Sequence, residues 1–193
     1  MSVVALNCPV CGAAVSTKQK LCEYCDNELV ITSFTSVLSM GSKQSRKYIE
    51  SYRQALATDP DNAHINSAVA MCYLNLGLHD KAYEAFSRAI EDDFDNPETY
   101  FYCAVSRLEG KRPYSLTLSE VRKVEQYLDA AISIEPRGVF YLFHAFVKHD
   151  FFERKCLNTT PDYRELFATA REIGVSDTDV AVLEELLGYQ VWV

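Results

Sequence analysis

The chain has 193 residues, of which 48% are apolar and 12% aromatic, so it can bury the core of one ordinary domain plus a small appendage. Six prolines and seven glycines are too few for a low-complexity or linker-dominated protein. The formal net charge of −8 repels phosphate backbones and therefore disfavours nonspecific binding to nucleic acid or to anionic membranes.

The N-terminal residues do not resemble a secretory signal. The opening stretch, MSVVALNCP, has neither a basic start nor an apolar run of adequate length. The most apolar run of the chain, residues 139–147, is far shorter than the roughly 20 residues that span a bilayer. We therefore expect a cytoplasmic protein without a membrane span.

Four of the seven cysteines form two pairs of equal spacing, Cys8-x2-Cys11 and Cys22-x2-Cys25. Each pair predicts a tight knuckle whose two sulfurs face the same point, and two knuckles can complete a tetrahedron around Zn²⁺. Gly12 favours the first knuckle because glycine adopts positive φ without steric cost. The spacing therefore predicts one zinc site.

Two alternatives compete with a zinc site. Disulfides need an oxidising compartment, which the N-terminus does not indicate. A thioredoxin-like redox site uses one C-x-x-C beside a βαβ pattern, and no such pattern is present. Four thiolates leave no open position for water or substrate, so the ion would be structural.

Residues 6–31 resemble a short zinc ribbon of the CPxCG…CxYC kind. The second knuckle departs from that pattern, because it continues as Asp26-Asn27 where glycine is more usual. Asparagine tolerates left-handed backbone better than most residues, so Asn27 is expected to replace the glycine.

From about residue 45 the apolar residues follow helical spacing. The stretch SRKYIESYRQALATDPDN shows the i, i+3, i+4, i+7 pattern of an amphipathic helix and then a proline-containing stop. Residues 32–44, which are rich in serine and threonine, are predicted to be a linker or a short helix. The apolar positions of the predicted helix are Tyr48, Ile49, Tyr52, Ala55 and Leu56.

The same helical pattern recurs in KAYEAFSRAIEDDFDNP and in VEQYLDAAISIEP. Ala55 and Ala89 are 34 residues apart, and Ala89 and Ala131 are 42 residues apart. The first period is that of a tetratricopeptide repeat, and the second indicates the same repeat with an insertion.

The second unit resembles a tetratricopeptide repeat position by position. Ala70 and Tyr73 occupy the small and aromatic positions of the first helix, and Gly77 opens the turn. Small residues let the two helices approach closely, and a large residue fills the gap between neighbouring hairpins. In the second helix these positions are Ala82, Phe86 and Ala89.

The third unit is less regular. It keeps Tyr100 and Ala104, but Arg107 stands where an aromatic is expected, and EGKRPYSLTLSE is inserted before the second helix. A further first-helix pattern follows the closing proline. Two more helices are predicted at about 160–173 and 177–188, where they would cap the exposed end of the array.

The predicted fold is therefore mainly α: a tetratricopeptide-like α-solenoid of helical hairpins with C-terminal capping helices, plus a small N-terminal β zinc ribbon. We predict three parts: residues 1–31 as the zinc ribbon, 32–44 as the linker or short helix, and 45–193 as the repeat domain with its caps.

The resemblance to tetratricopeptide repeats implies a concave groove lined by the first helix of each hairpin. Such a groove would be apolar with an acidic edge and would suit an amphipathic helix or an extended segment with basic flanks. Alternatively, Phe101, Leu142 and Phe146 pack against the C-terminal helices. The implied groove residues are His64, Ser67, Met71, Leu74, Asn75, Glu98, Phe101, Val105, Leu108 and Glu109.

Three smaller features complete the predictions. The terminal GYQVWV either docks on the last helices or serves as a recognition tail. The insertion EGKRPYSLTLSE is a second candidate contact because it is locally basic. The remaining cysteines, Cys72, Cys103 and Cys156, are expected to be buried core thiols.

The sequence shows no nucleophile elbow and no phosphate-binding glycine loop, and its four histidines form no obvious ligand set. We therefore predict a noncatalytic adaptor or scaffold that binds another protein, with the ribbon as a second docking surface or a cap on the first repeat. The alternative is a regulator that contacts nucleic acid or the transcription machinery through the ribbon.

Overall fold

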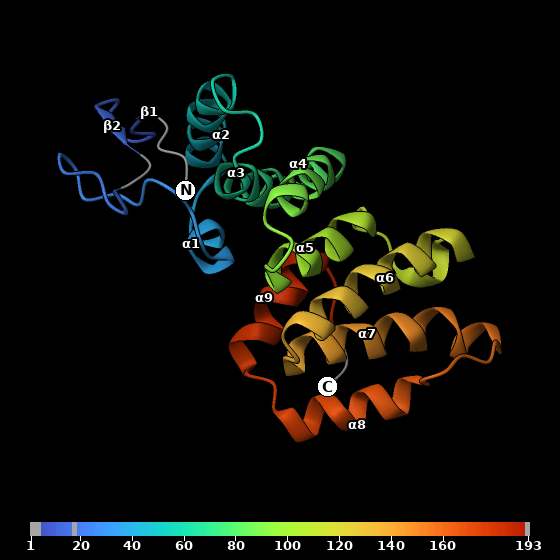
Figure 1. Cartoon of the computed structure of the whole chain (residues 1–193). Coiled ribbons are helices and arrows are strands. Elements are labelled where there is room, and N and C mark those ends of the chain that lie inside the picture. The colour runs from blue at the N-terminus through green and yellow to red at the C-terminus, as the bar shows by residue number, and fades with distance from the viewer. Residues whose placement is uncertain (1–4, 17–18, 192–193) are drawn as a thin grey trace. The chain divides into compact units, whose positions relative to one another are not determined.

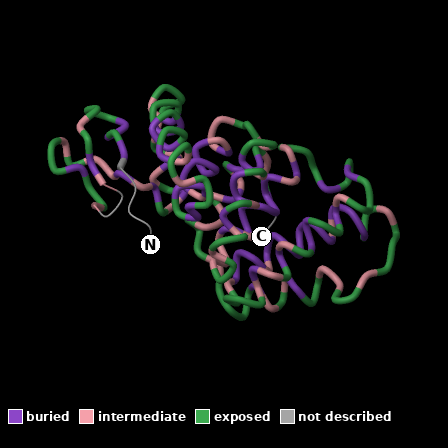
Figure 2. The backbone as a smooth tube through the Cα atoms, turned by 45° about the horizontal axis from the view of Figure 1, so that its top comes forward, coloured by how far each residue is buried: buried purple, intermediate pink, exposed green. Residues whose placement is uncertain are grey.

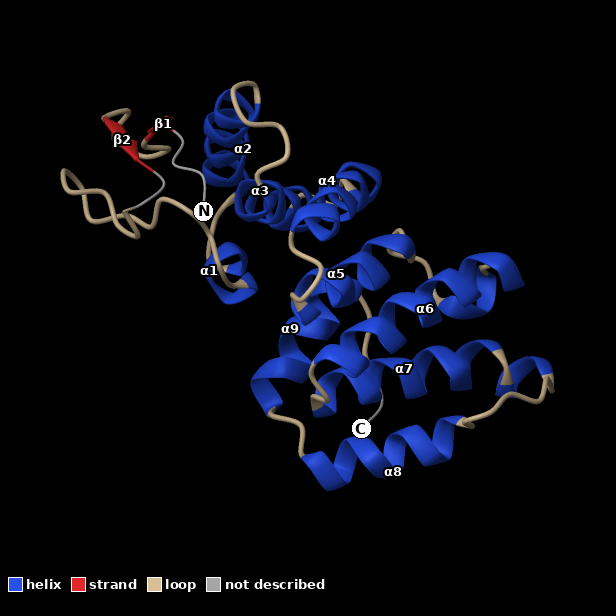
Figure 3. Ribbon diagram, viewed as in Figure 1, coloured by secondary structure: helices blue, strands red, loops and turns tan. Residues whose placement is uncertain are grey.

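A computed structural model describes residues 5–16 and 19–191, which are mainly helical with one small two-stranded sheet (Figures 1 and 3). The chain divides into two compact units, Met1–Phe94 and Asp95–Val193. The first unit contains β1 (Ala5–Asn7), β2 (Ala14–Ser16), α1 (Phe34–Leu38), α2 (Ser42–Leu56), α3 (Ala63–Asn75) and α4 (His79–Asp92). The second contains α5 (Pro97–Arg107), η1 (Pro113–Ser115), α6 (Leu118–Ile134), α7 (Gly138–Phe151), η2 (Glu153–Lys155), α8 (Tyr163–Ile173) and α9 (Asp177–Leu187).

The first unit begins with a short hairpin. Strands β1 and β2 are antiparallel, with Leu6 opposite Val15. Both of these side chains are buried, whereas the neighbouring Asn7 and Ala14 are exposed, as the alternation of a strand requires. A β-bridge between Leu21 and Glu28 closes the next loop on itself.

Helices α3 and α4 form the hairpin that the repeat pattern predicts. Ala70, Ala82 and Phe86 are all fully buried, so the small residues allow close approach and the phenyl ring fills the space beside them. The turn is made by Gly77, which has a φ of +68°. Asn62 begins α3 by accepting a hydrogen bond from the Ile65 amide at 3.1 Å.

In the second unit, the insertion after α5 is part of the fold. Asp150 on α7, which is 1% exposed, forms an ion pair with Arg112 at 2.9 Å and accepts the Tyr114 amide at 2.9 Å. Pro113 and Leu116 are buried. The basic insertion predicted as a contact surface is therefore partly engaged inside the unit, where Arg112 shares the Asp150 carboxylate with Arg154 at 2.7 Å.

Helix α7 is buried along almost its whole length (Figure 2). The Phe101 ring from α5 packs on it, with centroid distances of 5.0 Å to Phe140 and 5.7 Å to Phe143. At the start of α7, a Cβ on Gly138 would collide with the carbonyl oxygen of Gly174. A glycine is therefore required where the turn between α8 and α9 crosses α7.

The two C-terminal helices are confirmed close to their predicted bounds. Asp162 and Glu165 form a capping box at the start of α8, and Gly174, with a φ of +93°, ends it. Ser176 caps α9 by accepting the Asp179 amide at 3.1 Å.

The segment after α9 folds back onto the second unit as far as the structure describes it. The Tyr189 ring lies 5.8 Å from that of Phe146, its hydroxyl donates to the Lys111 carbonyl at 3.1 Å, and Val191 is 2% exposed. Trp192 and Val193, which belong to the predicted tail, lie outside the described residues. Within the described ranges, none of the helices is long and apolar enough to cross a membrane.

Candidate functional site

The four cysteines of the two pairs meet in the first unit. All four Sγ atoms of Cys8, Cys11, Cys22 and Cys25 lie within 4.8 Å of one another. Cys8 and Cys25 are 3.6 Å apart, and Cys11 and Cys22 are 3.7 Å apart. A tetrahedral Zn²⁺ with Zn–S bonds of about 2.3 Å needs edges of about 3.8 Å. The cluster could therefore hold a metal ion.

The two knuckles repeat the same backbone geometry. The Gly12 amide donates to the Cys8 carbonyl at 2.9 Å, and the Asp26 amide donates to the Cys22 carbonyl at 2.8 Å. Gly12 has a φ of +78° and Asp26 a φ of +55°. The expectation that Asn27 supplies the left-handed residue is therefore wrong, and the aspartate one position earlier supplies it.

The side chain of Asn27 instead forms a hydrogen bond with the sulfur of Cys25. Its side-chain amide donates to Cys25 Sγ at 3.5 Å and to the Cys25 carbonyl at 2.9 Å. The hydrogen bonds from its backbone and side-chain N–H groups lower the pKa of the Cys25 thiol to about 6. At Cys11 the Ala13 amide favours the thiolate, but desolvation and the three neighbouring thiols together raise its pKa to about 12. Four thiolates so close together therefore need a cation between them.

The segment that carries the knuckles is hydrogen-bonded to one face of α2. The Tyr48 hydroxyl donates to the Glu28 carbonyl at 2.7 Å. The Tyr52 hydroxyl donates to the Leu29 carbonyl and accepts the Ile31 amide, both at 3.1 Å. Both rings are at most 1% exposed. The sequence places these tyrosines on the apolar stripe of a helix, but it does not reveal that their hydroxyls bind the ribbon.

Tyr52→Phe is expected to lower the free energy of unfolding of the first unit by about 1–3 kcal/mol, because it leaves a buried N–H and a buried C=O without a partner. Urea denaturation measures the loss, and hydrogen exchange of the Ile31 amide locates it. The matched control is Tyr24→Phe, since Tyr24 is 68% exposed and its hydroxyl loss should cost nothing measurable. Equal stability of the two variants would contradict the structural role of the Tyr52 hydroxyl.

Eight of the ten predicted groove residues lie on α3 and α5, and the other two, Leu108 and Glu109, directly follow α5; the ten differ in exposure. Five are buried: Met71, Leu74, Phe101, Val105 and Leu108. His64 is exposed, and four are of intermediate exposure: Ser67, Asn75, Glu98 and Glu109.

The aromatic members of the predicted groove take part in packing within the second unit. Phe101 contacts Phe140 and Phe143, and Phe146 contacts Tyr189. Phe101 therefore packs on α7, and Phe146 packs on the segment that follows α9. The half-exposed Glu98 forms an ion pair with Arg137 at 2.8 Å.

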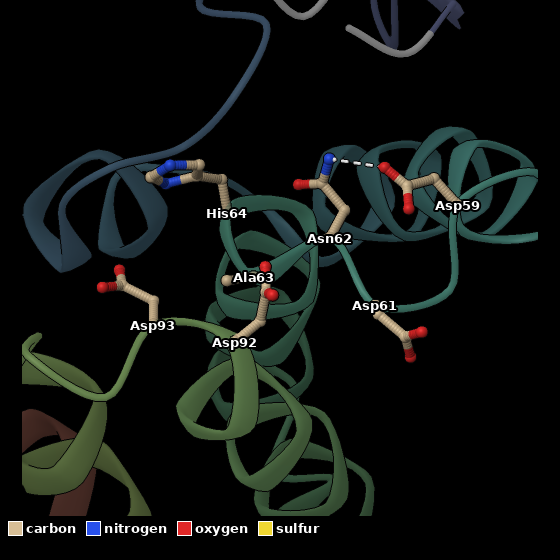
Figure 4. Close-up of a pocket in the computed structure, with 7 residues that line it drawn as sticks. All are labelled: Asp59, Asp61, Asn62, Ala63, His64, Asp92 and Asp93. Atoms are coloured by element: carbon tan, nitrogen blue, oxygen red, sulfur yellow. Dashed lines mark hydrogen bonds between the residues drawn. The ribbon is translucent and has the colours of Figure 1, made fainter. Parts of the chain in front are cut away.

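An acidic hollow lies beside His64, the exposed residue among the ten predicted groove residues. His64 and Asn62 at the start of α3 lie beside a cavity of about 470 Å³ that four aspartates also line (Figure 4). The Asn62 amide donates to Asp59 at 3.1 Å. The aspartates come from the loop before α3 and from the end of α4: Asp59, Asp61, Asp92 and Asp93.

The other three cysteines do not join the cluster. Cys72 and Cys103 are fully buried, as predicted, and burial raises the pKa of the Cys72 thiol to about 12. Cys156 is exposed and has a φ of +55°, so the prediction of a buried thiol is wrong there. It ends the turn after η2, where the chain leaves the α7 core.

Comparison with known proteins agrees with this architecture. Residues 49–100, which run from α2 into α5 and contain the α3–α4 hairpin, match the family model of the tetratricopeptide repeat. No curated protein matches the chain in sequence.

Two solved structures share the fold. "Crystal structure of MamA protein" is 17% identical with a TM-score of 0.56, and the match covers 80% of this chain and 90% of that one. "MamA MSR-1 C2" is 16% identical with a TM-score of 0.51, covering 74% and 77%. The chain is thus a tetratricopeptide-like helical repeat protein. It carries a cluster of four cysteines at its N-terminus that could hold zinc.

Proposed function

We propose that this protein is a noncatalytic adaptor that binds a partner protein through its tetratricopeptide-like helices. The observation that carries the proposal is the repeat match over residues 49–100, because stacked helical hairpins present extended surfaces for other proteins. An adaptor of this kind needs no clustered catalytic groups, and the sequence motifs indicate none.

The metal of the ribbon is one structural Zn²⁺ held by Cys8, Cys11, Cys22 and Cys25. Support comes from the donor set, since four thiolates at tetrahedral separations select zinc over the oxygen-seeking cations. A closed shell of four sulfurs leaves the ion no role in chemistry. Free thiolates persist in a reducing compartment, which favours a cytoplasmic protein.

The ribbon provides a second docking surface. Three large apolar side chains of the knuckle region are exposed, at 39% for Val10, 55% for Leu21 and 68% for Tyr24. Such side chains on a small module suit contact with another protein. Residues 28–31 of the segment are hydrogen-bonded to α2, whereas these three side chains are exposed, so the ribbon can bind a partner while it contacts the first repeat helix.

The acidic hollow around His64 indicates the chemistry of one partner. Four aspartates at its rim attract lysine and arginine side chains, so a helix or an extended segment with basic flanks fits there. The acidic hollow includes His64, the exposed member of the predicted groove. The buried members belong to the cores of their own units, Met71 to the first and Phe101 to the second.

The proposal is tested by affinity purification from the native host with the tagged, zinc-loaded chain as bait. We expect one or more partners that are retained at physiological salt and reduced at least tenfold when Asp61 and Asp92 are both changed to lysine. The matched control, Glu172→Lys with Glu185→Lys, makes the same charge change at exposed positions of the second unit. If no protein is enriched over the tag alone, the adaptor proposal is wrong. If partners ignore the aspartate changes, the acidic hollow is not their site.

A further inference from the structure

A second groove crosses the first unit, over α3 and between α2 and α4. Two adjoining cavities of about 430 Å³ and 470 Å³ share Arg53, Tyr73 and Lys81 among their lining residues. Together they form one continuous depression, which we name the basic groove. It belongs entirely to the first unit.

The walls of the basic groove carry four cations at matched spacing. Arg46 and Arg53 are seven residues apart on α2, and Lys81 and Arg88 are seven residues apart on α4. Seven residues are about two helical turns, or about 10.5 Å along the axis. Each wall therefore carries two cationic residues whose backbone positions are about 10 Å apart along the helix.

Three of these cations form no ion pair among the described residues, although the Glu84 carboxylate also lines the groove. Arg88 forms an ion pair with Glu84 at 2.7 Å. Across residues 5–16 and 19–191, no carboxylate lies within ion-pair distance of Arg46, Arg53 or Lys81. A chain with a net charge of −8 thus concentrates unpaired positive charge in one depression. That concentration favours an anionic ligand, since bringing one in relieves the repulsion between the walls.

The floor of the groove is apolar and aromatic. Val69 is 2% exposed, and the half-buried ring of Tyr73 lies 5.9 Å from Lys81 Nζ. Leu78 at one end is 41% exposed. Charged walls over an apolar floor suit a ligand that alternates charged and apolar groups, as the side chains of an extended peptide do.

This groove lies mostly apart from the predicted concave surface, of whose ten residues Asn75 alone is among the lining residues of the two cavities. At 100° per residue, Val69, Tyr73 and Leu76 lie roughly on the opposite side of α3 from His64, Met71 and Leu74. It also differs in charge, because the concave side carries the aspartates around His64. The two faces of one hairpin therefore recognise opposite charges.

We propose that the basic groove binds an acidic, extended segment of a partner protein. In an extended chain, side chains on the same face recur every two residues, so acidic side chains two or four residues apart are about 7 Å or about 13 Å apart and bracket the spacing of about 10 Å between the cations of each wall. A polynucleotide fits less well, because its uniform phosphate charge meets a strongly acidic chain and an apolar floor. The proposal deepens the adaptor function and rests on it.

Selection from a random octapeptide library displayed on phage tests the groove directly, with the full zinc-loaded chain as target. We expect enrichment of peptides with two or more aspartates or glutamates, separated by apolar residues. For the best synthetic peptide, R53E/K81E should weaken binding at least tenfold in fluorescence anisotropy. The control K43E/K47E carries the same charge change on α2, at exposed positions that do not line the groove, and should weaken binding less than threefold.

Several outcomes would overturn the proposal. Enriched peptides that are not acidic, or that bind R53E/K81E as well as they bind the unaltered chain, exclude this ligand. A single-stranded oligonucleotide that binds more tightly than the peptide and depends on Arg53 and Lys81 makes nucleic acid the occupant. Self-association in sedimentation velocity that R53E/K81E abolishes makes a second copy the occupant. If host partners still bind the R53E/K81E variant and no peptide binds the unaltered chain, the proposed role of the basic groove is wrong and the adaptor function is unaffected.

Discussion

Cys22→Ser abolishes metal binding and unfolds the ribbon, with zinc content expected to fall from about one ion per chain to near zero. The hairpin has few buried apolar side chains of its own, among them Leu6 and Val15. Structural zinc sites contribute apparent binding energies of about 10–16 kcal/mol near neutral pH, far more than such a small core. Loss of one thiolate therefore removes most of what keeps residues 5–31 folded.

The consequence extends to the first repeat helix. Tyr48 and Tyr52 on α2 lose the carbonyls and the amide that they bind in the ribbon segment, and their rings become exposed to water. Elemental analysis measures the zinc, and hydrogen exchange of residues 5–31 and of α2 measures the unfolding. Cys156→Ser is the matched control, since this exposed cysteine lies outside the cluster. Retention of one zinc ion and of amide protection in Cys22→Ser would show that the four-sulfur site is wrong.

Substitution of Glu125 on α6 is expected to cause the second large effect, a loss of folding stability. This carboxylate is 4% exposed and lies 3.0 Å from the ammonium of Lys148, which is 3% exposed. Arg122 also contacts it, at 2.8 Å. Glu125→Met leaves a buried ammonium without a counter-charge, which typically costs about 3–5 kcal/mol. Denaturation of the variant, with hydrogen exchange of α6 and α7, measures the loss.

A double variant separates the charge from the packing. Glu125→Met with Lys148→Met removes both charges and keeps the volume, so most of the lost stability should return. If the double variant is as unstable as Glu125→Met alone, the effect arises from shape and not from the unpaired charge. Glu172→Met, at an exposed position on α8, is the control and should change stability little.

The ion pair of Glu125 and Lys148 also makes the stability of the fold depend on pH. Burial opposes ionisation of Glu125, but the nearby side chains of His144, at 3.6 Å, and Lys148, at 3.0 Å, outweigh it and hold its pKa below the ordinary value of 4.5. A carboxylate with a lowered pKa stabilises the fold above its ordinary pKa and loses that contribution as the pH falls through the folded value. The stability difference between the unaltered chain and Glu125→Met should therefore shrink as the pH falls below 4.5.

Much of the architecture could be predicted because it depends on local chemistry. The cysteine spacing indicates the sulfur cluster, since a C-x-x-C turn brings its own two sulfurs together. Capping residues such as Asp162 and Ser176 mark helix starts through hydrogen bonds to amides two or three residues away. The 34-residue period between Ala55 and Ala89 indicates the hairpin for the same reason, because its helices are adjacent in sequence.

The interaction surfaces could not be predicted in the same way. The family resemblance implies Phe101 as a groove residue, but α7, some forty residues later, buries it. Asn27 has the right character for a left-handed turn, yet the register of the second knuckle gives that position to Asp26. In each case residues distant in sequence, or a shift of one position, decide what the side chain contacts.

By itself the sequence determined the cluster of four sulfurs, the helical repeat and the positions of the two C-terminal helices, because short-range spacing and backbone preferences specify them. Only the tertiary structure decided that tyrosine hydroxyls of α2 bind the ribbon, that Asp150 pairs with Arg112 of the insertion, and that Arg46, Arg53 and Lys81 line one groove. These contacts join residues separated by 20 or more positions or lying on different helices. Charge and hydrogen-bond complementarity over such separations arises from the packing of helices, and no local pattern in the chain encodes it.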